Sequence, residues 1–365
     1  MISCGSHISY EALEKTASNF TDKVDDTPSD STPTAPNEEL SVDYDSFLKR
    51  LKIVPTDPKQ NFPIAKLADK FIFAGQDNSH GIELWSMDLN GDNKKLVKDI
   101  FPGSDSSKIK NLVVINNIAL FFADDGTTGY ELWRSDGTAE GTFLLFDTTP
   151  ENRAHYDYSL NQNQVVFFND YIYFTFDHPD YGKELWKTQG EKGSTSLVSD
   201  YETGANNFSP RDFRVIGTRL LFIADTLANG QELFYLENDT INLLYDFTSD
   251  ASDGLYNSST LVQRGSEVFF TSQGNLWKSD GTIVGTTLLS ATNPFSMTLS
   301  ENFLYAEFDS GNGQEPHLID PNTGTLTELA DTTTGTETVC RTYFTPAEDG
   351  DMYITIGYTS GSCFG

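Results

Sequence analysis

The sequence predicts an all-β fold, a β-propeller of about seven four-stranded blades, from three observations. A Glu-Leu-Trp tripeptide recurs along the chain, turns rich in Gly, Asn and Asp separate short strands, and the second strand of each repeat is apolar without alternation. Strands of that kind are buried on both faces, as in sheets packed one against another. A parallel α/β sheet would also bury them, but it needs helices between strands, and the short turns leave no room for helices.

The tripeptide marks six repeats. Its copies are Glu83-Leu84-Trp85, Glu131-Leu132-Trp133, Glu184-Leu185-Trp186, Glu232-Leu233-Phe234 and the weaker Asn275-Leu276-Trp277 and Glu315-Pro316-His317. Successive copies are 40 to 53 residues apart. That period is typical of one propeller blade per repeat.

Each repeat is predicted to contain four antiparallel strands. In the second repeat these are residues 111–115, 119–123, the Glu-Leu-Trp strand and 142–146, with a tight turn at Asn116-Asn117. A polar loop that ends in Gly precedes each Glu-Leu-Trp strand. The corresponding second strands of the other repeats are 71–73, 171–174, 220–223, 268–270 and 303–305.

The two ends of the chain are predicted to share the last blade. Residues 344–347 and 352–359, joined by a turn at 348–351, copy the first two strands of a repeat, and residues 48–54 align with a fourth strand such as 95–100. An N-terminal strand in the last sheet would close the ring and leave no open edge. We therefore expect a polar tether over residues 1–43 and a propeller over residues 44–365.

Charge restricts the classes of partner. The formal net charge is −30, with 54 acidic and 24 basic residues, which argues against nucleic acid because phosphate backbones need a surplus of Lys and Arg. Cations or basic partners suit this surface, although acidity by itself also serves solubility. No run of about 20 apolar residues spans a membrane, and we expect a monomer.

The three cysteines suggest an extracellular protein. Met1-Ile2-Ser3-Cys4-Gly5 resembles the end of a bacterial lipoprotein signal, in which the Cys is lipidated; the true start would then lie upstream, and the chain would attach peripherally to a membrane. The alternative is an incidental Cys4 in a terminal segment. Cys340 and Cys363 are the predicted disulfide, because they flank two adjacent antiparallel strands.

One segment identifies a family. Residues 131–142, ELWRSDGTAEGT, resemble the signature of the bacterial ELWxxDGTxxGT repeat proteins, also called hyalin-like; residues 276–286 are a second good copy, and the copy at Trp186 is degenerate. The resemblance covers about residues 47–365. It implies a secreted or surface-attached bacterial propeller and no assigned activity. Read physically, Asp136, Gly137, Asp280 and Gly281 are tight-turn residues, and the Trp residues pack between blades.

Candidate binding residues gather on one predicted face. If strands alternate in direction, the loops between second and third strands share a face with the connections between blades. Acids that end second strands form an acidic mouth there, with two histidines beside it: Asp77, Asp125, Asp177, Asp225, Asp309, His80 and His178. The histidines of this face belong to different blades and lack close ligand spacing, which disfavours a shared metal.

No cofactor is predicted. Asp88-Leu89-Asn90-Gly91-Asp92 offers oxygens at alternating positions, as in a calcium loop, but it lacks the distal Glu and sits at a hairpin, so we interpret it as a turn.

The sequence favours a non-catalytic surface or secreted module, a scaffold or a propeller that recognises a protein, a glycan or a cation through the acidic mouth. None of the common nucleophile, zinc or phosphate-loop motifs is present. The alternative is a carbohydrate-active enzyme, a glycoside hydrolase or lyase with a carboxylate pair near the channel; Asp180, Glu307 and Asp309 are its candidates. Acids that follow the repeat symmetry argue against it, because a catalytic pair should break that symmetry.

Overall fold

The structure is a computed structural model that describes residues 6–7, 64–147, 164–256, 259–294, 296–300, 303–309, 314–329, 339–346 and 352–358. Its regular elements over these ranges are β-strands. Among the described residues no helix is long and apolar enough to cross a membrane. The predicted all-β class is confirmed.

Twenty-four strands form six antiparallel sheets of four consecutive strands each. The first three sheets contain β2 (Ile64–Lys66), β3 (Lys70–Gly75), β4 (Glu83–Asp88) and β5 (Lys95–Lys98); β6 (Lys110–Ile115), β7 (Ile118–Asp124), β8 (Tyr130–Ser135) and β9 (Phe143–Phe146); β10 (Val165–Phe168), β11 (Tyr171–His178), β12 (Gly182–Thr188) and β13 (Ser196–Leu197). The next three contain β14 (Arg211–Ile216), β15 (Arg219–Thr226), β16 (Gly230–Glu237) and β17 (Thr240–Tyr245); β18 (Val262–Arg264), β19 (Glu267–Ser272), β20 (Asn275–Ser279) and β21 (Thr287–Ser290); β22 (Ser296–Ser300), β23 (Phe303–Asp309), β24 (Gln314–Ile319) and β25 (Leu326–Glu328). Each sheet corresponds to one predicted repeat.

The seventh sheet joins the two ends of the chain. It has the order β1-β27-β26, with β1 at Ser6–His7, β26 at Val339–Pro346 and β27 at Met352–Tyr358. Ser6 pairs with Ile354 and His7 with Tyr353, so an N-terminal strand from within the predicted tether lies beside the second strand of this sheet. The predicted closing strand at residues 48–54 lies outside the described residues.

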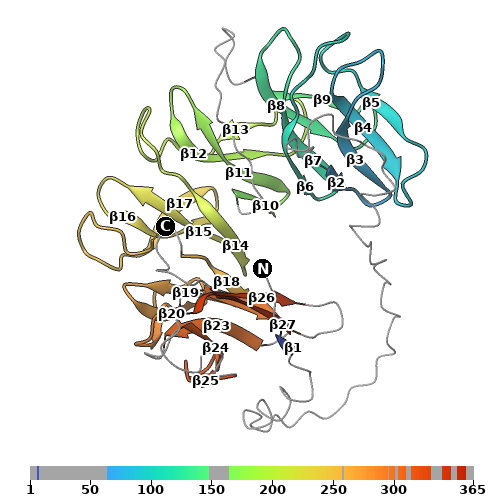
Figure 1. Cartoon of the computed structure of the whole chain (residues 1–365). Helices are drawn as coiled ribbons and strands as arrows, with labels where there is room; N and C mark the ends of the chain where they lie inside the picture. The colour runs from blue at the N-terminus through green and yellow to red at the C-terminus, as the bar shows by residue number, and fades with distance from the viewer. Residues whose placement is uncertain are drawn as a thin grey trace, which may run out of the picture.

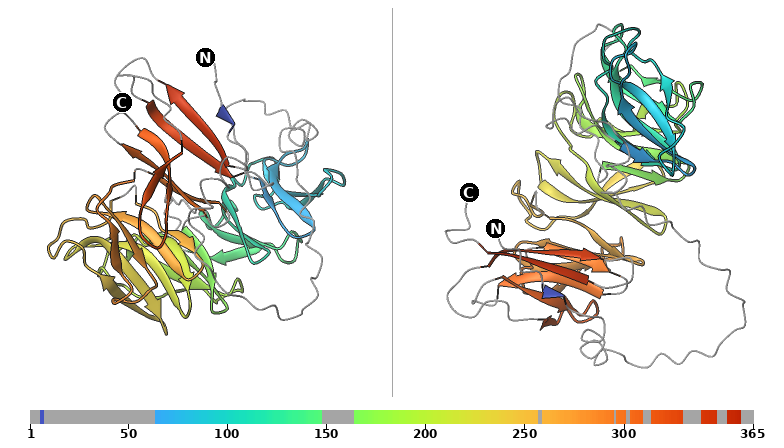
Figure 2. Two further views of the ribbon diagram at one scale, coloured as in Figure 1. Left: turned by 90° about the horizontal axis from the view of Figure 1, so that it is seen from below. Right: turned by 45° about the vertical axis from the view of Figure 1, so that its right-hand side comes forward.

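The sheets follow one another along an arc (Figure 1). Figure 1 shows the first strands β2, β6, β10 and β14 toward the inside of the arc. First strands of neighbouring sheets are in contact, as β2 is with β6, β6 with β10 and β10 with β14. The first and last sheets occupy the two ends of this propeller-like arrangement (Figure 2).

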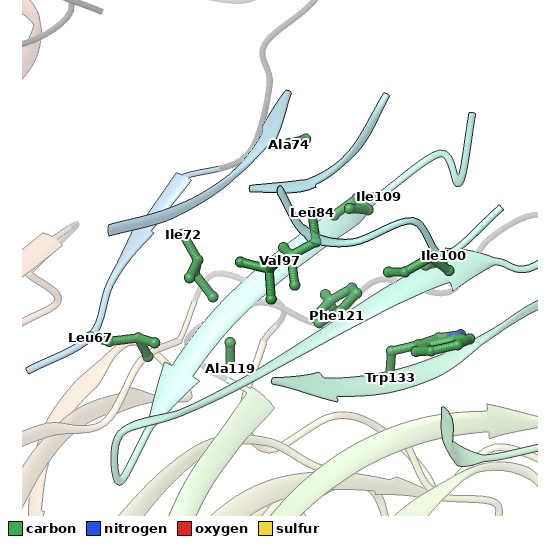
Figure 3. Packing of buried hydrophobic residues seen from close by; sticks show 11 residues of the cluster. Leu67, Ile72, Ala74, Leu84, Val97, Ile100, Ile109, Ala119, Phe121 and Trp133 are labelled. Atoms are coloured by element: carbon green, nitrogen blue, oxygen red, sulfur yellow. The ribbon is translucent and has the colours of Figure 1, made fainter. Parts of the chain in front are cut away.

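Neighbouring sheets pack face to face through apolar side chains, in the way the uninterrupted second strands predict. The cluster between the first and second sheets combines Ile72, Leu84 and Val97 with Phe121 and Trp133 (Figure 3). Trp186 packs in the same way between the second and third sheets, and Trp277 between the fourth and fifth. In each case the Trp of the repeat faces the preceding sheet.

The first sheet has the same apolar face. Ile64, Phe71, Phe73, Trp85 and Met87 form a cluster that belongs to this sheet alone. Trp85 is the repeat Trp, so this face is the equivalent of the one through which later sheets contact their predecessors. In a closed ring it would face the last sheet.

The Ser-Asp-Gly-Thr segments are tight turns between third and fourth strands. The Asp136 carboxylate accepts hydrogen bonds from the Thr138 amide at 3.0 Å and hydroxyl at 2.6 Å, and the Ser135 hydroxyl accepts one from the Gly137 amide at 2.9 Å. Gly137 has φ +82°, a conformation that only Gly adopts without strain. A Cβ on Gly141 would lie 2.0 Å from the Asp136 carboxylate. The motif is thus explained by turn formation.

The second good copy repeats these bonds in the fifth sheet. The Asp280 carboxylate accepts from the Thr282 amide at 2.9 Å and the Ser279 hydroxyl from the Gly281 amide at 3.1 Å. In the degenerate third repeat, the Thr188 hydroxyl takes the Ser role and accepts from the Gly190 amide at 3.1 Å. The turn persists there without its Asp, which is why the motif can decay while the sheet remains.

Candidate binding face

Loops between second and third strands meet the connections between sheets, as predicted from strand direction. The Ser107 amide in the first connection donates to the Ile82 carbonyl at 3.1 Å, and the Phe208 amide in the third donates to the Lys183 carbonyl at 3.0 Å. The Gly254 amide donates to the Gln231 carbonyl at 3.1 Å in the fourth sheet. We call the surface formed by these loops and connections the connection face.

The Glu of each Glu-Leu-Trp motif holds this face together. The Glu83 carboxylate is fully buried. One oxygen accepts from the Ile100 amide at 2.7 Å and the Phe101 amide at 3.3 Å, and the other accepts from the Ser107 amide at 3.0 Å. Because these amides lie in the connection to the next sheet, Glu83 fixes the position of that connection.

Two further repeats use the same device. Glu184 accepts from the Glu202 amide at 3.0 Å, and Glu232 accepts from the Phe247 amide at 3.1 Å. Both side chains are fully buried. Sequence reasoning missed this role; its signal was a Glu placed at the same point of several otherwise apolar strands.

Burial changes the protonation of these carboxyls. Loss of water contact raises the pKa of Glu184 to about 8 and that of Glu232 to about 7, although the backbone amides oppose the change. Burial likewise raises the pKa of Glu83. These groups therefore retain protons that free glutamates release near pH 4.5.

Stability is consequently expected to fall as the pH rises from about 5 to about 8. Over this interval the unfolded chain binds fewer protons than the folded one, so each such carboxyl lowers the free energy of unfolding by at most about 1.4 kcal/mol per pH unit. The contribution is complete below the unfolded pKa and lost above the folded one. Thermal unfolding at a series of pH values measures the slope. The slope should be smaller in Glu184→Gln, and a melting temperature that is flat or rises over this range would contradict the assignment.

The acids of the mouth occupy two different positions. Strand pairing sets Asp124, Asp177, Asp225 and Asp309 opposite Tyr130, Lys183, Gln231 and Gln314. Asp125 follows Asp124, and Asp77 follows Gln76, which comes directly after β3. The predicted acids therefore do not occupy equivalent positions, because the loops after the second strands differ in length. Asp124 occupies the position that is equivalent to Asp177, Asp225 and Asp309.

Asp77 and Asp125 serve as turn residues. Asp77 accepts from the Ser79 and His80 amides, both at 2.8 Å, and Asp125 accepts from the Thr127 amide at 2.8 Å and the Thr128 amide at 2.7 Å. His80 Nδ1 lies 2.9 Å from the Asp77 carboxylate. This hydrogen bond raises the pKa of His80, which favours its cationic form.

Asp177 and Asp225 lie nearer the sheets. Lys183 Nζ lies 3.9 Å from the Asp177 carboxylate, whose side chain is 42% exposed. Burial, with Asp253 and Glu202 nearby, raises the pKa of Asp225. The side chain of Asp309, at the end of β23, lies outside the description.

Arg211 stands beside Asp225 at the start of β14. Its guanidinium donates to the Ser259 and Tyr256 carbonyls, both at 2.8 Å, and to the Gln231 side chain at 3.0 Å. These hydrogen bonds of Arg211 therefore hold β14 against the connection that follows the fourth sheet.

His178 is an aromatic packing residue at the edge of the third sheet. Its ring stacks on Trp186 with centroids 5.4 Å apart and lies 4.8 Å from the Tyr181 ring. Nδ1 accepts from the Asp180 amide at 3.1 Å. His317 occupies the position of the repeat Trp in the sixth sheet, where it is buried and its ring meets Phe308 edge-on.

No group of three or more His, Cys, Asp or Glu side chains that could hold a metal ion occurs within the described ranges. The calcium-like segment is a hairpin turn, as interpreted above: the Gly91 amide donates to the Asp88 carbonyl at 2.9 Å, and Asp92 accepts from the Asn90 amide group at 3.0 Å. Cys4 and Cys363 lie outside the described residues. Cys340 lies in β26, but its side chain is not described.

No protein-family model matches the chain, and no curated protein matches it. Similar solved structures include the β-propeller domain of the trilobed protease from Pyrococcus furiosus, with TM-score 0.37 and 14% identity over 75% of this chain and 86% of that one. TolB from Acinetobacter baumannii matches with TM-score 0.34 and 11% identity over 80% and 65% of the two chains. A chain of the nidogen/laminin complex matches with TM-score 0.34 and 12% identity over 72% and 92%. At these values the similarity concerns the propeller-like fold alone, which the six consecutive four-stranded sheets already show.

Proposed function

We propose that the chain is a non-catalytic binding module of the bacterial cell surface or exterior, which recognises a basic partner through the connection face. Thirteen Asp or Glu residues and one lysine, Lys108, lie in the described loops of this face, at residues 76–82, 99–109, 124–129, 177–182, 198–210, 225–229 and 246–256. This imbalance is the observation that carries the proposal.

The rigidity of the connection face supports a binding function. The buried Glu side chains fix the connections, and the Asp turns fix the loops, so the negative charges are held in place before a partner arrives. Preorganised charge of one sign steers an oppositely charged partner and lowers the entropy cost of binding. A basic protein segment suits such a surface best; a cationic glycan or a metal ion is an alternative ligand for the same charge.

The resemblance to the ELWxxDGTxxGT repeat proteins and the Cys4 segment support an extracellular location. In this proposal Cys4 carries the lipid, two residues before β1 of the seventh sheet.

The ring closes in this proposal, with seven blades. The supporting observation is the apolar face of the first sheet, where Trp85 occupies the position that contacts the preceding sheet in later repeats. The seventh sheet is the partner that completes this pattern.

Two of the three candidates for the enzyme alternative can be placed by their side chains, since that of Asp309 is not described. Asp180 lies in the loop between β11 and β12 of the third sheet, whereas Glu307 is buried in β23 of the sixth. Two sheets separate them along the arc, so the structure does not bring them together as a pair.

Charge reversal on exposed loop acids tests the proposal. Asp105 and Asp180 are exposed. Unlike those of Asp77 and Asp125, their carboxylates are not the acceptors of the turn hydrogen bonds on this face. Asp105→Lys/Asp180→Lys is expected to weaken co-sedimentation of the full chain with bacterial envelope fragments by about tenfold or more at low salt.

The matched control changes the same charge on the opposite face. Glu140 and Glu191 are exposed in the turns between third and fourth strands, and Glu140→Lys/Glu191→Lys should leave binding within about twofold. Equal loss in both variants would show a general charge effect, and unchanged binding in the first would remove the connection face from the function.

A further inference from the structure

The carboxyl group of Glu184 has fewer hydrogen bonds than those of Glu83 and Glu232. Its side chain is fully buried. Oε1 accepts from the Glu202 amide at 3.0 Å, but within the described part of the chain Oε2 has no hydrogen-bond partner. Ionisation would place negative charge on an oxygen that is removed from solvent and has no donor, which is strongly unfavourable. The neutral acid is therefore the form that suits this position.

The first sheet shows which donor is missing. There the Ser107 amide donates to the second oxygen of the Glu83 carboxylate at 3.0 Å. Phe208 stands at the equivalent point of the third connection, residues 198–210, and its amide donates to the Lys183 carbonyl at 3.0 Å. Glu184 thus lacks the bond that completes the hydrogen bonding of Glu83.

The charges beside Glu184 also oppose its ionisation. Burial is the main cause that raises the pKa of this carboxyl to about 8, and the charges of Asp200 and Glu202 in the third connection add to it. Lys183, the preceding residue of β12, has its Nζ 3.9 Å from the Asp177 carboxylate. That lysine is therefore shared with another acid.

The fourth sheet adds no excess of positive charge on its side of the connection. Asp225 lies close enough to Glu202 and to Arg211 for their charges to interact, and Arg211 donates to carbonyls of the following connection. Tyr201 stays neutral, because burial raises the pKa of its phenol. The acids around Glu184 thus outnumber the basic groups.

Glu202 links the buried carboxyl to the surface. Its amide donates to Glu184, and its own carboxylate accepts from the Leu227 amide at 3.2 Å. Leu227 is exposed in the loop between β15 and β16. These hydrogen bonds join the third sheet, the third connection and a loop of the fourth sheet, so a change at the buried end reaches the connection face.

We infer that Glu184 is a proton-controlled clasp of the connection face: as the neutral acid it holds residues 198–210 against the third sheet, and as the carboxylate it releases them. Release lets water reach the charged carboxylate and moves it away from Asp200 and Glu202. The step is the loss of one proton to solvent and needs no other reactant. The Tyr201 ring stacks on Phe208 with centroids 4.4 Å apart, and this contact limits the release to a local opening.

A rise in pH favours the released form. Once released, Glu184 ionises near the ordinary glutamate pKa of 4.5, whereas the held form keeps its proton up to about pH 8. The ratio of released to held chains therefore increases by up to about tenfold per pH unit from about pH 5 to about pH 8, and is constant above that.

The consequence for binding rests on the proposed function. Asp200 and Glu202 are two of the acids that we propose meet a basic partner, so their displacement should weaken envelope binding between about pH 6 and pH 8. Exposed carboxylates are already ionised over this range, and lysine side chains remain charged. Simple charge attraction would therefore not weaken.

Hydrogen exchange of the full chain, measured by mass spectrometry at a series of pH values and corrected for the intrinsic exchange rate, tests the clasp. Protection of residues 198–210 should fall by up to about tenfold per pH unit between about pH 5 and pH 8, while β7 of the second sheet stays protected. Protection of residues 198–210 that is constant over this range would overturn the inference, and this comparison needs no variant.

Glu184→Gln removes the titrating proton and keeps one acceptor oxygen. Protection of residues 198–210 should then be independent of pH. Glu83→Gln is the matched control, because it makes the same substitution at the equivalent residue of the first sheet, and it should leave the pH dependence of the third connection as in the unchanged chain. The same pH dependence in Glu184→Gln as in the unchanged chain would contradict the role of Glu184.

Co-sedimentation with envelope fragments at the same pH values separates the clasp from the proposed function. Binding that weakens with pH in the unchanged chain, but not in Glu184→Gln, supports both. If protection falls while binding is constant, the clasp stands and the proposed role of these acids in binding fails. Constant protection overturns the clasp whatever the binding result.

Discussion

Replacing Glu83 with alanine is expected to lower the free energy of unfolding by about 3 kcal/mol or more. The backbone amides of Ile100 and Phe101 donate to this buried carboxylate, and each buried amide left without an acceptor costs about 1–3 kcal/mol. The Ser107 amide also donates to it but keeps the Ile82 carbonyl as a second acceptor. Chemical denaturation of the full chain measures the change.

Two variants make this result specific. Glu328→Ala removes an exposed glutamate of β25 and should cost less than about 0.5 kcal/mol. Glu83→Gln keeps one acceptor oxygen and should fall between the two. If Glu83→Ala behaved like Glu328→Ala, the repeated Glu would not hold the connection face.

Trp133→Ala is expected to cost about 3–5 kcal/mol, because it removes a large buried side chain from the cluster between the first two sheets. The informative partner is Trp85→Ala. If the last sheet covers the first, Trp85→Ala should cost a similar amount, because the same side chain then fills the same kind of interface.

The comparison uses the same denaturation measurement. Val284→Ala, at a side chain that is 90% exposed, supplies the baseline and should change stability by less than about 0.5 kcal/mol. A cost for Trp85→Ala less than half that for Trp133→Ala would indicate that the apolar face of the first sheet has no sheet against it.

Much of each sheet could be predicted from its residues. The uninterrupted run around Phe121 required burial on both faces, and β7 is buried between two sheets. Asn116 and Asn117 predicted a tight turn, and both have positive φ there. These features depend on residues that are neighbours in the sequence, so they can be predicted without information on tertiary contacts.

Features that depend on register could not be predicted. The row of mouth acids depends on where each second strand ends, and a difference of one residue moves a side chain to the other face of its sheet. A bulge at the start of β14 separates Arg211 from Arg214, which no spacing in the sequence indicates.

The buried Glu shows a second limit. In the sequence, Glu83 reads as one more acid of a strongly acidic protein. Its partners are backbone amides 17 to 24 residues later in the chain, and amides leave no trace in the identity of their side chains. Repetition was the only available signal.

The most direct test of the closed propeller is hydrogen exchange measured by mass spectrometry, comparing the full chain with a chain that ends at residue 338. Removing the seventh sheet exposes the face of its neighbour, so β23 and β24 should lose protection in either arrangement, which provides the internal control. In a closed ring β3 and β4 of the first sheet should lose protection as well, while β15 and β16 of the fourth sheet should stay protected. Loss confined to the sixth sheet, with β3 and β4 unchanged, would contradict closure.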